Sequence, residues 1–519
     1  MSQTTLRIRR SLLEVQADYE NGNKKPLEDL MRAWKGIKEL PHDNPKSFFK
    51  LGGYHGEPFR GPGTTSSAYW GGYCNHGNVL FPTWHRVYLV KLEEALQSIP
   101  GCSDVMLPYW DETSEESLNN GIPWALTVRD FVLDGLTIPN PLRSFFFPVS
   151  IVDQVDGDKS AYNKPQGYET VRYPLSGLVG TAEAQAETDK HNSLYPDYDK
   201  NVDILNGNIT GWMNNTVVLP APTPPRKIGV NEEFKRCLKA PNYTVFSNTT
   251  SAGEWNQANA DNVVPLESPH NHIHLAVGGF DVPGQGNFSP IADANGDMGE
   301  NDTAGLDPIF YFHHCNIDRV FWLWQKRTGN TDELEIIPFY PGTNSSDSQG
   351  PTPGFPPNTI LDINSPLYPF LKTNEAGKQV SYTSQDCINI EKQLDYTYSL
   401  GSLEGDTQEI QLMAGASTKK VLISGINRAE IKGSFVVSAF ANIDGEKHLI
   451  GYQSVLSRWN VKRCSNCLNH VEVKAAFDLH SFTEDRLTSA TYHVEIKSRR
   501  QESPTAALTE KKLYHLEIR

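Results

Sequence analysis

Three features are missing from the chain, and each absence excludes a class of protein. None of its apolar runs approaches the ~20 residues that a membrane-spanning helix needs. Its first segment, MSQTTLRIRRSLLEV, lacks the uninterrupted apolar stretch and the small-residue cleavage site of a signal peptide. The seven cysteines show no paired framework, which fits a reducing compartment. We therefore expect a cytoplasmic protein with no membrane partner.

Positive charge is also scarce. The 519 residues include 47 Lys and Arg against 62 Asp and Glu, which gives a formal net charge of -15. Nucleic-acid phosphates require a basic face, so this balance argues against nucleic acid as a partner. No internal repeat is visible, and the length is sufficient for more than one domain and a large core.

Histidine is uncommon as well, yet it is concentrated in a few places. Of the 15 histidines, eight lie in the segments GGYHG, CNHGNVLFPTWHR, SPHNHIH and DPIFYFHHCNIDR. A single histidine of this kind is more often a hydrogen-bonded core residue than a ligand. Six together favour a metal centre, and two facing sites of three imidazoles each suit a pair of copper ions. The two sets are His55, His76 and His85, and His270, His274 and His314.

The spacing predicts that several of these histidines lie on helices. His270 and His274 are four residues apart, which places both rings on one face of a helix. Residues 81–96 are predicted to form a second helix, with Pro82 in its first turn and apolar residues at helical spacing. A third helix is expected over 307–325, with Asp307 as N-cap and Pro308 at the first helical position. A zinc hydrolase built on HxxxH is disfavoured, because the sequence contains no HExxH.

The motifs FPTWHR, PYWD, HxxxH and DPIFYFHHCNIDR, in this order, resemble those of the type 3 copper proteins: tyrosinases, catechol oxidases and molluscan-type haemocyanins. The resemblance covers roughly residues 5–400. It implies two copper ions with O₂ as co-substrate, copper A held by the first three histidines and copper B by the second three. It also implies that His313 lies at the substrate entrance and shapes the pocket, and that His272 points away from the metal.

Cys74-Asn75-His76 resembles the Cys-x-His element that forms a thioether to the histidine ring in fungal tyrosinases and molluscan haemocyanins. Such a bond would lock the orientation of His76 on a loop. The alternative is an ordinary buried thiol, because free cysteine is among the most buried residue types.

Residues around the second histidine set are expected to take part in proton transfer. By the same resemblance, a Glu and an Asn hold a water that deprotonates the phenol. Asn271 matches the Asn, and Glu267 is the expected carboxylate, with Asp261 as the alternative. A negative charge at Glu267 is equally well explained by the dipole of the helix that it opens. Asn301 takes the position at which plant catechol oxidases place a bulky Phe over copper A, which implies a more open entrance.

The segment LDYTYSLGS resembles the tyrosine motif that closes the catalytic domain in this family, through Tyr396 and Tyr398. In relatives this motif pairs with an N-terminal arginine, for which Arg9 and Arg10 are both available.

After about residue 415 the pattern changes to short runs of β-branched and aromatic residues with turns between them, such as KKVLISGI and GSFVVSAFANI. This pattern predicts a C-terminal β-sandwich of roughly 100 residues. The expected fold is therefore a mainly α catalytic domain over 1–400, a linker over 401–415 and an all-β domain over 416–519.

Proenzyme forms of tyrosinases carry such a β domain as a lid that inserts an apolar side chain over the copper pair. The resemblance implies Val455 or Leu456 as this side chain, with Tyr452 as the next choice. Cys464 and Cys467 form a lone CxxC, which is a weak signal. Two interpretations of this pair remain equal alternatives. One is copper loading, as inferred for some fungal protyrosinases, because thiolates suit Cu(I). The other is a purely structural pair.

The sequence thus predicts a copper oxidoreductase that uses O₂ to hydroxylate monophenols at the ortho position and to oxidise o-diphenols to o-quinones. It is expected to be latent until the C-terminal domain is removed. A catechol oxidase without monophenolase activity is the first alternative and a haemocyanin-like O₂ carrier the second. The expected partners are small phenols, with a second copy of the chain, an activating protease and a copper donor left open.

Overall fold

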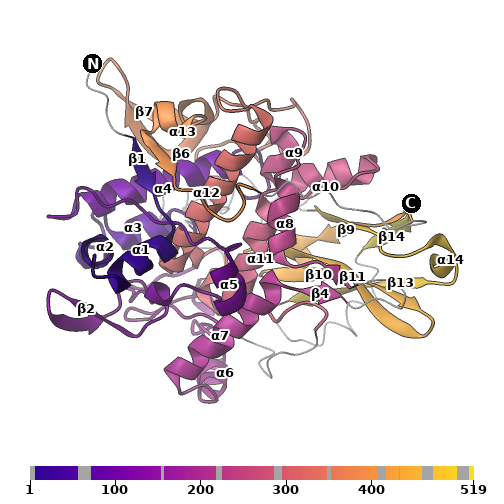
Figure 1. Cartoon of the computed structure of the whole chain (residues 1–519), viewed down its shortest axis with the longest axis horizontal. Helices are drawn as coiled ribbons and strands as arrows, with labels where there is room; N and C mark the ends of the chain where they lie inside the picture. The colour runs from indigo at the N-terminus through magenta and orange to yellow at the C-terminus, as the bar shows by residue number, and fades with distance from the viewer. Residues whose placement is uncertain are drawn as a thin grey trace.

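Figure 1 shows a body made mainly of helices with a group of strands from the C-terminal part of the chain against one side of it. The computed structural model describes residues 6–56, 72–153, 157–217, 225–285, 295–347, 352–405, 417–431, 433–458, 472–498 and 514–519. The predicted fold class, a mainly helical part followed by an all-β part, is confirmed.

The helical part is built around three buried helices. The helices and their bounds are α1 (Leu12–Glu20), α2 (Lys25–Glu39), α3 (Phe48–Gly53), α4 (Phe81–Gln97), α5 (Glu115–Asn120), α6 (Ala182–Asn192), α7 (Tyr198–Met213), α8 (Val230–Cys237), α9 (Tyr243–Ser247), α10 (Thr249–Ala258), α11 (Glu267–Gly278), α12 (Ile309–Thr328) and α13 (Ile390–Gln393). Almost every residue of α11, and of α12 from Ile309 to Gln325, is buried. Helices that are apolar or buried on all sides form the centre of a large core, and α4 packs against both α2 and α12 there.

Two of these central helices were expected from the sequence, and their starts differ in detail. α4 matches the predicted span closely. α12 begins at Ile309 with Pro308 as its N-cap, one residue later than predicted. Asp307 still accepts a hydrogen bond from the Ile309 N–H at 3.1 Å. Its carboxylate also pairs with Arg172 at 2.7 Å, a tertiary contact that the local sequence did not reveal.

Short strand pairs connect the helices. They are β1 (Arg7–Arg9) with β8 (Tyr396–Tyr398), β2 (Asp130–Leu133) with β3 (Leu136–Pro139), β4 (Thr216–Val217) with β5 (Arg226–Lys227), and β6 (Pro366–Thr373) with β7 (Gln379–Thr383). The β1–β8 pair is parallel and joins the two ends of the helical part, with Arg9 opposite Tyr398.

The C-terminal strands form two three-stranded sheets, as the sandwich prediction requires. They are β9 (Lys420–Asn427), β10 (Phe435–Ile443), β11 (Glu446–Val455), β12 (Glu472–Asp478), β13 (Thr491–Ser498) and β14 (His515–Ile518), with α14 (Glu484–Leu487) between β12 and β13. The strand orders are β11-β10-β13 and β12-β9-β14. The sequence analysis did not identify β11. This strand begins with the charged residues Glu446 and Lys447 and contains Gly451, so it lacks a run of β-branched residues. The predicted boundary at 401–415 stays a prediction, because most of it lies outside the described residues.

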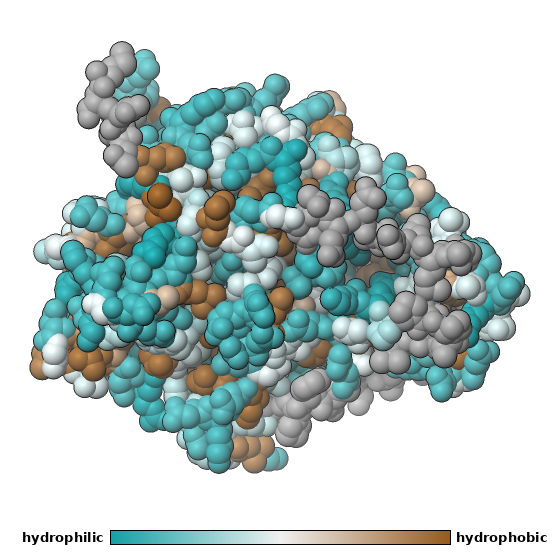
Figure 2. Space-filling view, viewed as in Figure 1, coloured by the Kyte–Doolittle hydropathy of each residue, from teal (hydrophilic) through white to brown (hydrophobic). Residues whose placement is uncertain are grey.

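The visible face of the molecule is largely hydrophilic, with apolar residues in small scattered patches (Figure 2). None of the helices in the described ranges is long and apolar enough to cross a bilayer.

Arg9, rather than Arg10, is the arginine that meets the tyrosine motif. Its guanidinium lies 3.7 Å from the ring centre of Tyr396 and donates to the Tyr398 hydroxyl at 3.1 Å. It pairs with Glu93 at 3.0 Å and with Asp318 at 3.5 Å, and all of these charged side chains are buried. Burial by itself raises the pKa of Asp318, but Arg86 and Arg9 outweigh it and hold that pKa below its usual value. This buried network ties β1 and β8 to α12.

We expect Arg9→Met to lower the free energy of unfolding by about 3–5 kcal/mol, because it leaves Glu93 facing no cation at this position in the core. The matched control is Arg10→Met. The Arg10 side chain is 37% exposed and pairs with Asp18 at the surface, so its loss should cost about 0–1 kcal/mol. Urea denaturation of both variants measures the difference, and equal losses would contradict the role of Arg9.

Candidate metal centre

The first histidine group is assembled from three separate pieces of chain. His55 lies in the turn after α3, His76 in the loop before α4, and His85 in the first turn and a half of α4. Their ligand-capable atoms all lie within 4.8 Å of one another, and all three side chains are buried. The arrangement is therefore a pocket that could hold one metal ion.

Close backbone contact positions His55. A Cβ on Gly305 would lie 2.7 Å from the Gly52 carbonyl oxygen and 2.9 Å from the His55 Cβ. A Cβ on Gly56 would lie 1.9 Å from the Asp302 carbonyl oxygen. Only glycine fits at these contacts, so the segment around residues 302–305 packs directly on the turn that carries His55.

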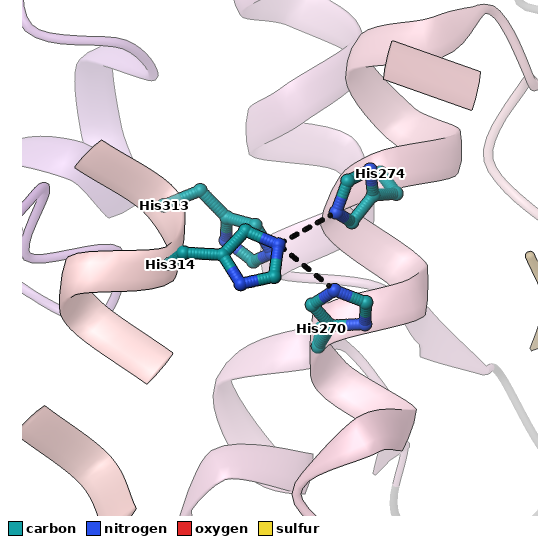
Figure 3. Close-up of side chains that lie close together, drawn as sticks. All are labelled: His270, His274, His313 and His314. Atoms are coloured by element: carbon teal, nitrogen blue, oxygen red, sulfur yellow. Dashed lines mark hydrogen bonds between the residues drawn. The ribbon is translucent and has the colours of Figure 1, made fainter. Parts of the chain in front are cut away.

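The second group comes from two helices that face each other. His270 and His274 project from α11 toward His314 on α12, and His313 lies behind them (Figure 3). His314 Nε2 is 3.2 Å from His270 Nε2 and 3.2 Å from His274 Nε2. The two groups face each other, because the rings of His85 and His314 stack with centroids 4.4 Å apart. The predicted i, i+4 placement of His270 and His274 on one helix is confirmed.

Hydrogen bonds at Nδ1 decide which ring nitrogens are available to a metal. A carbonyl oxygen only accepts, so Nδ1 must carry the proton in His55, which faces the Asn301 carbonyl at 2.9 Å. The same holds for His85, which faces the Phe81 carbonyl, and for His274, which faces the Met298 carbonyl, both at 2.8 Å. In these neutral rings Nε2 is then left with its lone pair. Nε2 of His55 and of His85 has no hydrogen-bond partner among the described residues.

Such converging lone pairs fit a metal ion. Nitrogens at about 2.0–2.1 Å from an ion, the usual imidazole distance, lie about 3 Å apart. The 3.2 Å separations at His314 agree with this geometry. Without an ion, Nε2 of His314 could donate one proton to one neighbour only, and the other nitrogen pair would repel. The donor set, all imidazole and no thiolate, suits copper among the first-row metals.

The electrostatics of the site favour the ligand form of each ring. Burial, reinforced by the neighbouring imidazoles, holds the pKa values of His55, His76 and His85 well below their ordinary value. The pKa values of His270, His274 and His314 are lowered in the same way and for the same reasons. The six rings are therefore neutral at neutral pH, as metal binding requires.

Glu267, the expected carboxylate, connects the helix of the second group to the loop that carries His76. Its Oε1 accepts from the Gly77 N–H at 2.9 Å, directly after His76, and its Oε2 accepts from the Thr249 N–H and hydroxyl. Burial raises its pKa, which the hydrogen bonds from Thr249 partly offset. The alternative residue, Asp261, is exposed. Glu267 is thus both the first residue of α11 and a clamp on the loop that carries His76.

Asn271 and Asn301 each hold a histidine in place. Asn271 Oδ1 lies 2.9 Å from His270 Nδ1, and its amide nitrogen donates to the Ser454 carbonyl at 3.4 Å. Asn301 has no exposed surface, its carbonyl binds His55, and its side-chain amide lies 3.5 Å from Cys74 Sγ. Asn301 is enclosed in this arrangement. Its expected role at the substrate entrance stays a prediction. The thioether between Cys74 and His76 also stays a prediction, and burial raises the pKa of the Cys74 thiol.

Glu112 is a buried residue of the site that the sequence analysis missed. It follows the PYWD motif directly, and its Oε1 lies 2.5 Å from His313 Nδ1. His313 is fully buried and its ring stacks on that of His270, with centroids 5.3 Å apart. The ligand-capable atoms of His270, His274, His313 and His314 all lie within 4.8 Å of one another, so the role of His313 as a pocket-shaping neighbour stays a prediction. In the sequence, Glu112 could have been noticed only as a carboxylate next to the PYWD motif, and that position alone does not indicate a role in the site.

The C-terminal strands reach the same region. Val455 lines a small cavity of about 130 Å³ together with Asn271, and Leu456 is buried beside it in sequence. Arg458 pairs with Asp302 at 3.3 Å, close to the turn that carries His55. Tyr452, the next choice for the covering side chain, packs instead on His272 and Trp212, on the face of α11 away from the histidine groups. Cys464 and Cys467 lie outside the described residues.

Comparisons with known proteins agree with this site. The model of the common central domain of tyrosinase matches residues 45–327, more than half of the chain. Tyrosinase HcTyr2 of Hahella sp. is 56% identical over 513 residues, which cover 95% of this chain and 92% of that protein. A tyrosinase of Aspergillus oryzae is 44% identical, over 89% of this chain and 88% of its own. The solved structure of the tyrosinase from Burkholderia thailandensis superposes with a TM-score of 0.88 at 52% identity, over 99% of both chains.

Fold and site together define an oxidoreductase of the type 3 dicopper class, which uses O₂. The chain belongs to the tyrosinase family. The family acts on phenols, so the expected substrate class and the expected cofactor, a pair of copper ions, hold for this chain.

The pKa shift of His313 predicts how stability depends on pH. Burial lowers its folded-state pKa from 6.5 to about 3, so the unfolded chain takes up the proton first as the pH falls below 6.5. Stability is then lost on acidification, and from about pH 7.5 to 5.5 this one group contributes about 1.4 kcal/mol. Between about pH 7.5 and 5.5, we expect the free energy of unfolding of the copper-free chain to fall by about 1.4 kcal/mol more than that of His313→Gln. Urea denaturation at both pH values measures it, and parallel losses would contradict the shift.

Proposed function

We propose that this protein is a tyrosinase that hydroxylates monophenols at the ortho position and oxidises o-diphenols to o-quinones. The observation that carries the proposal is the pair of facing, buried imidazole groups, three histidines in one and four in the other, whose ligand-capable atoms converge. In this proposal His55, His76 and His85 hold one copper ion, and His270, His274 and His314 hold the other. Bound there, a copper pair would supply the redox chemistry for O₂ activation and phenol oxidation.

The protein's own groups position the substrate and receive its proton. Glu267 is buried, and its pKa is raised by burial, which brings a carboxylate closer to the strength that a general base needs near neutral pH. Asn271 fixes His270 through Oδ1. We assign to these two residues a bound water through which the phenol hydroxyl proton passes to Glu267. Glu112, through His313, fixes the far wall of the second group.

The C-terminal strands are assigned to a lid that keeps the enzyme latent. β11 packs on α11, its Ser454 carbonyl meets Asn271, and Arg458 meets Asp302 beside the first group. Val455 is the preferred covering side chain, because it lines the same cavity as Asn271. Leu456 remains the second candidate.

Replacing one ligand should remove one metal ion. We expect His274→Ala to bind one copper ion per chain instead of two and to lose both oxidation reactions, because the α11–α12 group loses a lone pair. The matched control is His272→Ala on the same helix, whose ring faces Glu233 at 3.0 Å and away from the site. Metal analysis of the loaded proteins decides, and two copper ions in His274→Ala would refute the ligand assignment.

Replacing the proposed base should separate the two reactions. We expect Glu267→Gln to lower kcat/KM for a monophenol by about 10²-fold and that for catechol by much less, since general-base catalysis typically contributes 10²–10⁴-fold. Asp261→Asn, the same change at an exposed carboxylate, should leave both unchanged. Equal losses with both substrates would mean that Glu267 acts only as the clamp on Gly77.

Oxygen uptake by the copper-loaded chain, before and after cleavage between Gly405 and Ser417, tests the proposal as a whole. We expect uptake with both a monophenol and catechol to rise after cleavage, because the strands from Lys420 onward would leave α11. Uptake with catechol alone would make the enzyme a catechol oxidase and remove Glu267 and Asn271 from proton transfer. Reversible oxygenation without turnover would indicate a carrier, and unchanged uptake would refute the lid.

A further inference from the structure

A cavity that lies apart from the histidine groups is found where the helical part meets the C-terminal strands. Its volume is about 420 Å³, which is the size of a small-ligand site. The walls come from α8 and α10 on one side and from β11 and β12 on the other. Figure 1 shows α8 and α10 next to the C-terminal strands.

The charge of this cavity is opposite to that of the whole chain. Six cationic side chains line it: Arg226, Lys227, Lys235, Arg236, Lys239 and Lys474. The carboxylates in its lining are Glu232, Glu233 and Asp478. A local excess of positive charge in a protein of net charge -15 focuses anions at this position.

Two arginines line the cavity, and only Arg236 pairs with a carboxylate of the described residues. Arg236 lies 3.3 Å from Asp478 Oδ2, while Asp478 Oδ1 already accepts from Asn262. Arg226 donates only to neutral oxygens: the carbonyls of Ile450 and Asp478 and the Ser481 hydroxyl. None of the described carboxylates forms an ion pair with Arg226. Burial lowers the pKa of Arg226 to about 10, and the nearby charge of Arg236 adds to this effect.

Part of the remaining wall is apolar, between polar side chains such as Asn256 and Gln453. Ala252, Val264, Pro265, Ala476 and Phe477 all line the same cavity. A fully inorganic ion would leave these side chains without contacts, whereas a ligand with an apolar body and a charged end would satisfy both kinds of surface.

We propose that this cavity is a binding site for a small organic oxyanion, a phosphate- or carboxylate-bearing molecule with an apolar body, which bridges α8 and the C-terminal strands. The oxyanion lies between Arg226 and Arg236 and receives charge-assisted hydrogen bonds from guanidinium groups. The apolar body lies against Phe477 and Val264. The site is separate from the proposed chemistry, because none of the histidines of the two groups lines it.

Calorimetric titration of the copper-loaded, full-length chain with phenylphosphonate tests this site, with inorganic phosphate as the second arm. We expect saturable binding of phenylphosphonate, weaker binding of phosphate, and a loss of affinity of about tenfold or more in Arg236→Gln. Arg32→Gln is the matched control: the Arg32 side chain is 29% exposed and the Arg236 side chain 31%, and both pair with aspartates. Affinity should be unchanged in this control.

Lys239→Gln provides a second variant from the same wall, should Arg236→Gln fail to fold, and it should also weaken binding. Absence of saturable binding by the unmodified chain would overturn the proposal. So would equal affinity in the cavity variants and in Arg32→Gln, which would place the ligand elsewhere. Phosphate binding as tightly as phenylphosphonate would overturn the organic part of the assignment. None of these outcomes depends on phenol oxidation, so failure here leaves the proposed function unaffected.

Discussion

The site depends on a simple constraint: imidazole Nδ1 groups that face backbone carbonyl oxygens must carry the proton there. The carbonyls of Asn301, Phe81 and Met298 impose this on three histidines from different parts of the chain. Each ring is thereby fixed in orientation and in tautomer, and its Nε2 lone pair is directed into a shared space. Burial then keeps the rings neutral. Residues 298–301 are central here, because this short segment holds one histidine of each group.

Helix α11 has two faces with different contacts. One carries His270 and His274, and the other carries His272, which packs against Tyr452 of β11 and lies 3.0 Å from Glu233 of α8. The helix therefore links the candidate metal centre to the strands that are assigned to the lid. The cavity lined by Arg226 and Arg236 lies at the same interface, between α8 and β11. A ligand in that cavity would contact both α8 and β11 without touching the histidine groups.

Local patterns predicted the parts of this structure that are determined by neighbouring residues. The four-residue spacing of His270 and His274 fixed their common helix face, and apolar periodicity gave α4 almost to the residue. Alternating β-branched residues identified most of the C-terminal strands. β11 escaped because its first residues are charged and a glycine interrupts it, although tertiary contacts with β10 and α11 make it a strand. Glu112 escaped for a similar reason, since only the fold brings it to His313.

The sequence by itself determined the chemistry of this protein: six histidines in motif order, a tyrosinase-like pattern around them, and a change from helical to β periodicity near its end. Only the tertiary structure decided between neighbours that the sequence treats alike. Arg9, the last residue of β1, is buried among Glu93, Asp318 and Tyr396, whereas Arg10, which follows the strand, pairs with Asp18 at the surface. Glu267 is enclosed because it opens the buried helix α11, whereas Asp261 lies in an exposed segment between α10 and α11. The residue types determine which ligand atoms are available, but burial and distance depend on how the chain packs.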